Sequence, residues 1–304
     1  MRLDDYRTSD NVGDERGQDS GGSGFGGGGG GIFPLLLGMV ASRFGIGGIL
    51  VLIVGALIFG GNPLALMGGG DNALPRSGAP ALTHEGAAHA CAVDAASKFS
   101  CQVLASTEDT WSRIFQQQGQ RYTPAGLIFY SRSGLSGCGA AQSAMGPFYC
   151  PVDQRVYLDT SFYDELKSRF GAPGDFAQAY VIAHEVGHHV QDLLGVLPKV
   201  TDQQRRVSAK QANALQVRVE LQADCFAGVW AAQNRNLLDP GDVEEGLKAA
   251  HAIGDDTLQQ EAQGRVVPDS FTHGTAAQRM EWLKRGIDSG DPARCDTFAT
   301  NADA

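Results

Sequence analysis

The residues His184-Glu185-Val186-Gly187-His188 are the clearest candidates for chemistry in this sequence. On an α-helix, two residues four apart differ by about 40° in direction, so the imidazoles of His184 and His188 point to the same face. Two imidazole nitrogens in that geometry can hold one Zn²⁺ at about 2.0–2.1 Å each. Glu185 follows the first histidine, where its carboxylate can reach a water on the metal without being a ligand. This HExxH arrangement predicts zinc-assisted hydrolysis with Glu185 as the catalytic base.

The competing interpretation is a chance match on an exposed helix face. The residues around the motif argue against it, because 180–183 read Tyr-Val-Ile-Ala and are followed by Val186, Gly187 and Val190. Polar side chains inside such an apolar helix need a partner to offset the cost of burial. A bound metal would supply that partner.

A third protein ligand must come from another part of the chain. The extended HExxHxxGxxH pattern requires glycine at 191 and histidine at 194, and this sequence has Gln191 and Leu194. A catalytic zinc needs three protein ligands and one open position. The sequence beyond Leu194 therefore has to provide the missing ligand.

A second long helix carries the best candidate, Glu220. Ser208 and Gln211 form a capping-box pattern that predicts a helix over 209–234. Glu220 and Asp224 lie one turn apart on it, among apolar neighbours. We expect Glu220 to be the third zinc ligand and Asp224 to accept the second ring N–H of a zinc histidine. The alternative is a surface carboxylate pair, which is unfavourable because like charges four residues apart destabilise a helix.

The elements around these helices predict an α+β fold. Asp175 is a plausible N-cap for the motif helix, which should run to about Leu194 and end at Gly195. The other expected helices are 92–106, 110–118 and 162–170, and the expected strands are 127–131, 147–150 and 155–159, the last two joined by a turn at 151–154. A small strand region would thus precede a mostly helical part that carries the motif. His84, Glu85 and His89 are interpreted as linker.

The chain contains six cysteines, all after residue 90: Cys91, Cys101, Cys138, Cys150, Cys225 and Cys295. None forms a CxxC pair, so a cysteine-based zinc knuckle is not expected. Local spacing favours the disulfides Cys91–Cys101 and Cys138–Cys150, which leaves Cys225–Cys295. Disulfides imply an oxidising compartment. The alternative is six buried thiols in a cytosolic protein.

The N-terminal quarter predicts a membrane anchor. Residues 1–43 are interpreted as a disordered, Gly-rich cytoplasmic tail, 44–61 as a transmembrane helix, 62–81 as a linker and 82–304 as the metallopeptidase domain. The 18 uncharged residues of 44–61 span about 27 Å as a helix, close to the roughly 30 Å of a bilayer core. Arg43 before them and Asp71 after them favour a single-pass protein in the cell membrane with a cytoplasmic N-terminus and an extracytoplasmic domain. A buried core helix is the competing interpretation of 44–61.

Four blocks of the sequence resemble a known family, the putative neutral zinc metallopeptidases, which are bacterial proteins with one N-terminal membrane helix. The blocks are HEVGHHVQ, RVELQADCFAGVW, GPFYCPVDQRVYLDTSFYDEL and FTHGTAAQRMEWLKRG. The resemblance covers most of the chain from about residue 82. It implies a gluzincin-type zincin-like domain with His184 and His188 as ligands, Glu185 as the catalytic residue and Glu220 as the third ligand. Gly187 is a weak helix former, and the family tolerates a small residue there.

The remaining catalytic role is an oxyanion donor. His273 precedes a helix capped by Thr275 and Gln278 and is our candidate, with Arg279 as the alternative for this role or as an anchor of the loop. A purely structural role for His273 stays open. We expect a peptide substrate to bind as an added strand beside the 147–159 hairpin.

The net charge and the motifs of the sequence indicate which binding partners to expect. A net charge of −10 argues against nucleic acid as a partner, since phosphate binding needs clustered Lys and Arg, and we expect neither nucleic acid nor a nucleotide. The expected partners are a protein or peptide substrate, Zn²⁺, and the membrane through one N-terminal helix. The alternative function is a membrane-tethered zinc-binding interaction or regulatory protein without proteolytic activity. A nucleophilic hydrolase is disfavoured because the sequence has no GxSxG motif.

Overall fold

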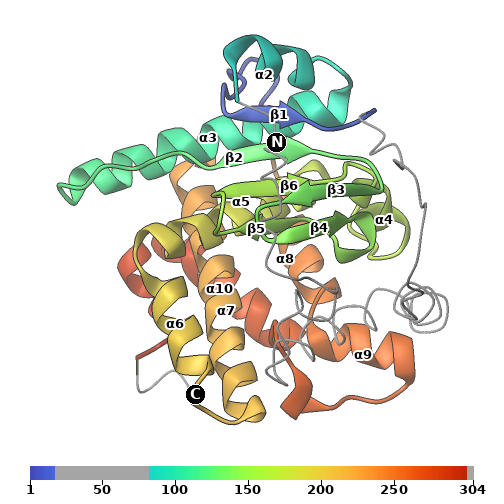
Figure 1. Ribbon diagram of the computed structural model, residues 1–304, viewed down its shortest axis with the longest axis vertical. Helices are drawn as coiled ribbons and strands as arrows, with labels where there is room; N and C mark the ends of the chain where they lie inside the picture. Colours follow the sequence, from blue (N-terminus) through green and yellow to red (C-terminus); the bar gives the residue numbers. More distant parts are fainter. Residues whose placement is uncertain (18–81, 300–304) are drawn as a thin grey trace, which may run out of the picture.

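The computed structural model describes residues 1–17 and 82–299, which form a mixed α+β fold dominated by helices (Figure 1). The strands are β1 (Val12–Asp14), β2 (Gly126–Phe129), β3 (Ser133–Ser136), β4 (Gly139–Gln142), β5 (Phe148–Cys150) and β6 (Arg155–Leu158). The helices are α2 (His84–Cys91), α3 (Ala95–Gln117), α4 (Phe162–Ser168), α5 (Asp175–Leu193), α6 (Val196–Gln204), α7 (Ala209–Gln233), α8 (Asp242–Ala252), α9 (Asp255–Gln263) and α10 (Ala276–Ser289). The α+β prediction is confirmed.

The main sheet has the strand order β1-β2-β6-β5. β1 and β6 are parallel to β2, whereas β5 and β6 are antiparallel, with Tyr149 opposite Val156. This confirms the predicted hairpin around 151–154. β5 is therefore an edge strand of this sheet, and it lies on the side of α7 and α10 in Figure 1, while β1 and α2 lie at the other edge. The separate β3–β4 hairpin was not predicted.

The helix α5 contacts β5 and β6 of this sheet, α7 packs on α5, and α10 packs on α7. Small residues let α7 and α10 touch along their backbones: a Cβ on Gly228 would lie 2.2 Å from the Leu283 carbonyl oxygen, and one on Gly286 would lie 2.0 Å from the Cys225 carbonyl oxygen. Real Cβ atoms do not approach that closely. Glycine at these two positions is therefore required for the helix pair.

All three predicted disulfides are confirmed. Cys91–Cys101 joins α2 to α3, Cys138–Cys150 joins the β3–β4 turn to β5, and Cys225–Cys295 joins α7 to the C-terminal segment. Their Cα atoms are 5.9, 5.8 and 5.6 Å apart, within the usual range for a disulfide. Each bridge ties a peripheral segment to an element of the core.

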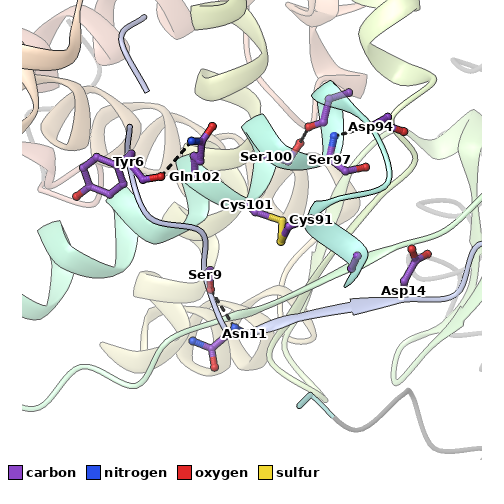
Figure 2. Close-up of a disulfide and its surroundings, with 12 residues drawn as sticks. Tyr6, Ser9, Asn11, Asp14, Cys91, Asp94, Ser97, Ser100, Cys101 and Gln102 are labelled. Carbon is purple, nitrogen blue, oxygen red and sulfur yellow. Dashed lines mark hydrogen bonds between the residues drawn. A yellow bond between two sulfur atoms is a disulfide. The ribbon is translucent and has the colours of Figure 1, made fainter. Parts of the chain in front are cut away.

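Residues 1–17 belong to the folded domain, as Figure 2 shows for the stretch that runs along α3. Val12 is opposite Leu127 in the parallel pair of β1 and β2, and the Gln102 side chain donates a 3.0 Å hydrogen bond to the Tyr6 carbonyl. Leu3 and Val12 are only 2% and 0% exposed. The prediction of a disordered tail is therefore wrong for residues 1–17, because their apolar side chains and backbone find partners that lie far away in sequence.

Two helical predictions also need correction. The predicted helices 92–106 and 110–118 are one unbroken helix, α3, which begins only at Ala95 and ends at Gln117. Thr107 and Glu108 do not interrupt it, since the Thr107 hydroxyl bonds the Leu104 carbonyl and Glu108 is buried against Ser9 and Asn11. The segment interpreted as linker at 84–91 is α2, whose first turn is capped by the Thr83 hydroxyl. Helices thus stand on both sides of the strand region in sequence.

The predicted membrane span at 44–61 and the predicted linker at 62–81 lie outside the described residues. Within residues 1–17 and 82–299, no helix combines the length and the apolar character needed to cross a bilayer.

We predict that Leu3→Ala destabilises the purified full chain by roughly 2–5 kcal/mol, because it removes a buried side chain and leaves a cavity. Leu135→Ala is the matched control: Leu135 is 52% exposed, and the loss should stay within about 0.5 kcal/mol. Denaturant titration followed by circular dichroism measures both. Equal midpoints for Leu3→Ala and the unmodified chain would show that residues 1–17 do not pack on the domain.

Candidate metal centre

The helix α5 places His184 and His188 one turn apart on the face that meets α7. It begins after Gly174, so Asp175 is its first residue and not its N-cap, and it ends before Gly195, which adopts a left-handed φ of 73°. The two imidazole rings have centroids 4.8 Å apart and are nearly perpendicular. His184 is 7% exposed and Glu185 8%, so this stretch of α5 is buried, as its apolar neighbours predicted.

Glu220 of α7 completes a three-ligand cluster with these histidines. Its Oε2 lies 3.2 Å from Nε2 of His184 and 3.4 Å from Nε2 of His188. Ligand atoms at tetrahedral angles around a zinc at about 2.0–2.1 Å are about 3.3–3.4 Å from one another. His184, His188 and Glu220 therefore fit a zinc ion in both donor type and spacing, and each has a ligand atom within 4.8 Å of the others.

A close helix contact makes this cluster possible. A Cβ on Gly187 would lie 2.9 Å from the Ala223 carbonyl oxygen and 3.3 Å from the Ala223 Cβ. Gly187 and Ala223 thus let α5 and α7 approach within a distance that larger side chains would prevent. The glycine costs helix propensity but brings Glu220 within reach of both imidazoles.

The second nitrogen of each histidine ring is held by an acceptor. Nδ1 of His184 lies 2.8 Å from Asp224 Oδ1, as predicted, and Nδ1 of His188 lies 2.8 Å from the side-chain oxygen of Gln191. A ring that donates from Nδ1 keeps the lone pair on Nε2 for a metal. Both Nε2 atoms face Glu220.

Asp224 is fully buried and accepts three hydrogen bonds from two groups besides His184. Nε and Nη2 of Arg279 donate 2.9 Å hydrogen bonds to the two carboxylate oxygens, and the Tyr180 hydroxyl donates one of 2.6 Å. Burial opposes ionisation, but the charges of Arg279 and His184 lower the pKa of Asp224 to about 2. Arg279 therefore holds Asp224 in place, a role that was not predicted, since the predicted roles were oxyanion donor or anchor of the loop that carries His273.

The two glutamates of the site differ in electrostatics. Burial opposes the charge of Glu220 too, yet the charges of His188 and His273 and hydrogen bonds from the ligand histidines hold its pKa well below the usual range. For Glu185, burial is the main effect and raises the pKa, while His184 and His188 only partly offset it. A carboxylate that stays ionised suits a metal ligand, and one with a raised pKa suits proton transfer.

The cluster opens into a cleft of about 400 Å³. β5 forms one wall, and the backbone of Tyr149 donates a hydrogen bond to Glu185. The apolar and aromatic residues of the lining include Phe148, Phe162, Phe170, Val181, Leu197 and Val200. His189, by contrast, points away from the cluster, with its ring between the Tyr149 hydroxyl and the Thr123 carbonyl.

His273 lines the same cleft and its side chain is 30% exposed. Asp255 holds it in place: Oδ2 accepts the backbone N–H groups of Thr272, His273 and Gly274, and Oδ1 lies 3.4 Å from His273 Nδ1. Burial lowers the pKa of His273, whereas the carboxylates of Glu220 and Asp255 raise it. The net effect is a raised pKa. The structure thus brings His273 into the site with the four residues predicted around the metal.

Sequence reasoning missed several residues that support the site. Tyr180 lies four residues before His184, Gln191 three after His188 and Gln216 four before Glu220, to which it donates a 2.9 Å hydrogen bond. Helical spacing alone could have identified these three. Asp255 lies 18 residues before His273 in sequence, and no local pattern connects them.

A second group of acidic residues, Asp175, Asp242 and Glu245, lies at the start of α5 and α8. The N-terminal ammonium group of Met1 is 2.8 Å from Asp175 and 3.3 Å from Asp242. Asp175 and Asp242 are thus already paired with a cation of the chain itself.

The comparisons with known proteins agree with this geometry. The family described as "Putative neutral zinc metallopeptidase" matches residues 1–298. The chain belongs to this family. It is 51% identical over 306 residues to the uncharacterized protein YpfJ of Escherichia coli K12, covering 98% of this chain and 99% of that protein. It is 42% identical over 212 residues to the uncharacterized protein Rv2575 of Mycobacterium tuberculosis H37Rv, covering 66% and 70%. No solved structure matches the chain.

We predict that Asp224→Asn destabilises the metal-free protein by roughly 3–5 kcal/mol, because it leaves the buried guanidinium of Arg279 without its counter-charge. The matched control is Asp202→Asn, which removes an exposed partner of Arg206 and should cost about 0–1 kcal/mol. Denaturant titration at pH 7 with a chelator present measures both.

The same variant tests the lowered pKa of Asp224. A depressed carboxyl pKa stabilises the fold fully above the unfolded value near 3.8, and this contribution is lost as the pH falls through about 2. The stability difference between the unmodified chain and Asp224→Asn should therefore shrink between about pH 4 and pH 2. A difference that stays constant over this range contradicts the assignment.

Proposed function

We propose that this protein hydrolyses peptide bonds with one zinc ion held by His184, His188 and Glu220. The observation that carries the proposal is that the Nε2 atoms of both histidines converge on one carboxylate oxygen of the neighbouring helix. Oε2 of Glu220 lies 3.2 Å from Nε2 of His184 and 3.4 Å from Nε2 of His188. The family membership supports the metal and the reaction class. A set of three protein ligands beside an open cleft is typical of catalytic zinc sites, which keep one position free.

Zinc bound in this site would lower the pKa of a bound water to about 7 and polarise the scissile carbonyl. Glu185 is the proposed general base and then the general acid: it takes a proton from the attacking water and delivers it to the leaving amine. Its raised pKa matches the second step, since burial favours the protonated form that must donate. The Tyr149 backbone hydrogen bond holds its carboxylate against β5.

β5 is the proposed platform for the substrate. It is the edge strand of the main sheet, lines the cleft and contacts Glu185 through its backbone. An extended peptide can pair with such an edge through main-chain hydrogen bonds, so that alternate side chains enter the cleft. The aromatic and aliphatic lining favours apolar substrate side chains beside the cleaved bond.

His273 is the proposed donor to the developing oxyanion. It lines the cleft and is oriented by Asp255, so its ring is fixed in position. Arg279 is not proposed for this role, because Asp224 and the Ile253 carbonyl engage its three side-chain nitrogens. A positioned donor of this kind contributes to catalysis by stabilising charge that forms in the transition state.

The alternative is a zinc-binding protein without proteolytic activity. The buried position of Glu185 disfavours it, because a carboxylate that is not needed for chemistry costs free energy in a buried site beside a cleft.

We propose that the domain lies outside the cytoplasm, because disulfides persist in oxidising compartments. We also propose membrane attachment through residues 44–61, on the basis of their uncharged apolar sequence. Residues 1–17 pair with β2 and pack on α3, so they belong on the same side of the membrane as the domain. A single crossing by residues 44–61 would separate them. The predicted cytoplasmic N-terminus and single-pass arrangement are therefore not retained.

We predict that replacing Glu185 by glutamine affects hydrolysis but not zinc binding, whereas the same replacement of Glu220 affects zinc binding. Glu185→Gln should keep one zinc per chain and lose hydrolysis by a factor of about 10²–10⁴ or more, since only the proton carrier is removed. Glu220→Gln should lose zinc, since an anionic ligand is replaced by a neutral amide. Metal analysis of the purified full chain and cleavage of a peptide library measure the two effects.

Each variant is the control for the other, because both change a buried glutamate of the same cleft. Full zinc content in Glu220→Gln refutes its role as ligand. Hydrolysis at the unmodified rate by Glu185→Gln refutes the mechanism. A zinc-loaded unmodified chain that cleaves no peptide supports the alternative function.

We predict that residues 1–17 and the domain react together in a topology assay. Cysteines introduced at the exposed positions Asp5 and Lys167 should both react with a membrane-impermeant maleimide in spheroplasts. Detergent lysis, which exposes every site, is the control. Labelling of Lys167→Cys with protection of Asp5→Cys restores the single-pass arrangement.

A further inference from the structure

Gln191 links a proposed metal ligand to the backbone of the neighbouring helix. It is fully buried on α5, and its side-chain oxygen lies 2.8 Å from Nδ1 of His188. Its side-chain nitrogen donates hydrogen bonds of 2.7 Å to the Val219 carbonyl and 3.0 Å to the side-chain oxygen of Gln222. The amide thus spans α5 and α7 one residue away from Glu220.

These contacts allow only one orientation of the Gln191 amide. A backbone carbonyl accepts hydrogen bonds and cannot donate them, so the group facing Val219 has to be the NH₂. The oxygen must then face His188. Because that oxygen only accepts, Nδ1 of His188 has to carry a proton, which leaves Nε2, beside Glu220, as the ring nitrogen that would bind a metal.

Gln222 fixes the outer end of this chain of hydrogen bonds. Its NH₂ donates 2.9 Å to the Cys295 carbonyl, again an acceptor only, so its oxygen has to face Gln191. Cys295 is 0% exposed and is tied to Cys225 of α7 by a disulfide. Two backbone carbonyls therefore determine both amide orientations.

We propose that Gln191, supported by Gln222, is a positioning residue that sets the tautomer and direction of His188 and thereby strengthens zinc binding. It does for His188 what Asp224 does for His184, with a neutral amide in place of a charged carboxylate. A neutral acceptor avoids a third buried negative charge beside Glu220 and Asp224. The inference rests on the metal site of the proposed function.

The test is zinc affinity of the full chain, measured by competition with a chelator. Gln191→Met removes all three side-chain hydrogen bonds at similar volume and should weaken zinc binding about 10–100-fold, the usual effect of losing a hydrogen-bond partner of a metal ligand. Gln222→Met should cause a smaller loss, since Val219 still orients Gln191. Gln102→Met is the matched control: Gln102 is 3% exposed, bonds backbone carbonyls of residues 4 and 6 and does not touch the site, so zinc affinity should not change.

A spectroscopic measurement separates positioning from packing. In the zinc-loaded, ¹⁵N-histidine-labelled chain we expect protected Nδ1–H signals from His184 and His188. Gln191→Met should lose the protection of His188 alone, because Asp224 still accepts from His184. The thermal melt of the metal-free variants confirms that they fold.

The outcomes are distinct. If the unmodified chain binds no zinc, the proposed function itself fails. If it binds zinc and folded Gln191→Met binds as tightly, this inference is overturned while the metal site stands. Should Gln191→Met not fold, unchanged affinity and unchanged His188 protection in Gln222→Met overturn it in the same way.

Discussion

The contact between α5 and α7 at Gly187 and Ala223 is the constraint on which the site depends. Glu220 reaches both imidazoles because nothing larger than a hydrogen separates the Gly187 Cα from the facing helix. The glycine pairing of Gly228 with Gly286 continues this packing from α7 to α10. Three packed helices therefore present Glu220 from α7, Arg279 from α10 and the histidine pair from α5, and the spacing of these side chains follows from the spacing of the helices.

Two negatively charged side chains, Glu220 and Asp224, are buried in the site. Glu220 and Asp224 are both enclosed, and each has compensating groups: Arg279 and Tyr180 for Asp224, the ligand imidazoles and Gln216 for Glu220. A buried ion pair contributes little net stability but is costly to break. Such a network is thus better suited to holding ligand geometry than to stabilising the fold. Burial raises the pKa of Glu185, and the charges of His184 and His188 offset that rise only in part.

The domain is assembled from two separated parts of the chain. β1 adds to the main sheet beside β2, at the edge opposite β5, so the edge that lines the cleft stays free of the N-terminal segment. Three disulfides join peripheral segments to the core. The one with the largest sequence separation, Cys225–Cys295, also holds the Cys295 carbonyl that bonds Gln222 in the hydrogen-bond chain to His188. The two described parts of the chain, residues 1–17 and 82–299, therefore fold as one unit.

The sequence by itself determined what local spacing encodes: the i,i+4 histidines, the capped helices at Ser208 and Thr275, the β5–β6 hairpin, the disulfides between nearby cysteines and Glu220 as the unmatched carboxylate on an apolar helix. These follow from helix and strand periodicity and from the cost of burying charge. Tertiary structure decided what depends on distant partners. No sequence pattern predicted β1, because its three residues form a strand only by pairing with the edge of β2. Asp255 positions His273 through a contact between residues that are distant in sequence. Arg279 binds Asp224, and its donor groups are therefore occupied. These interactions join residues that are distant in sequence, so they form only when the chain has folded.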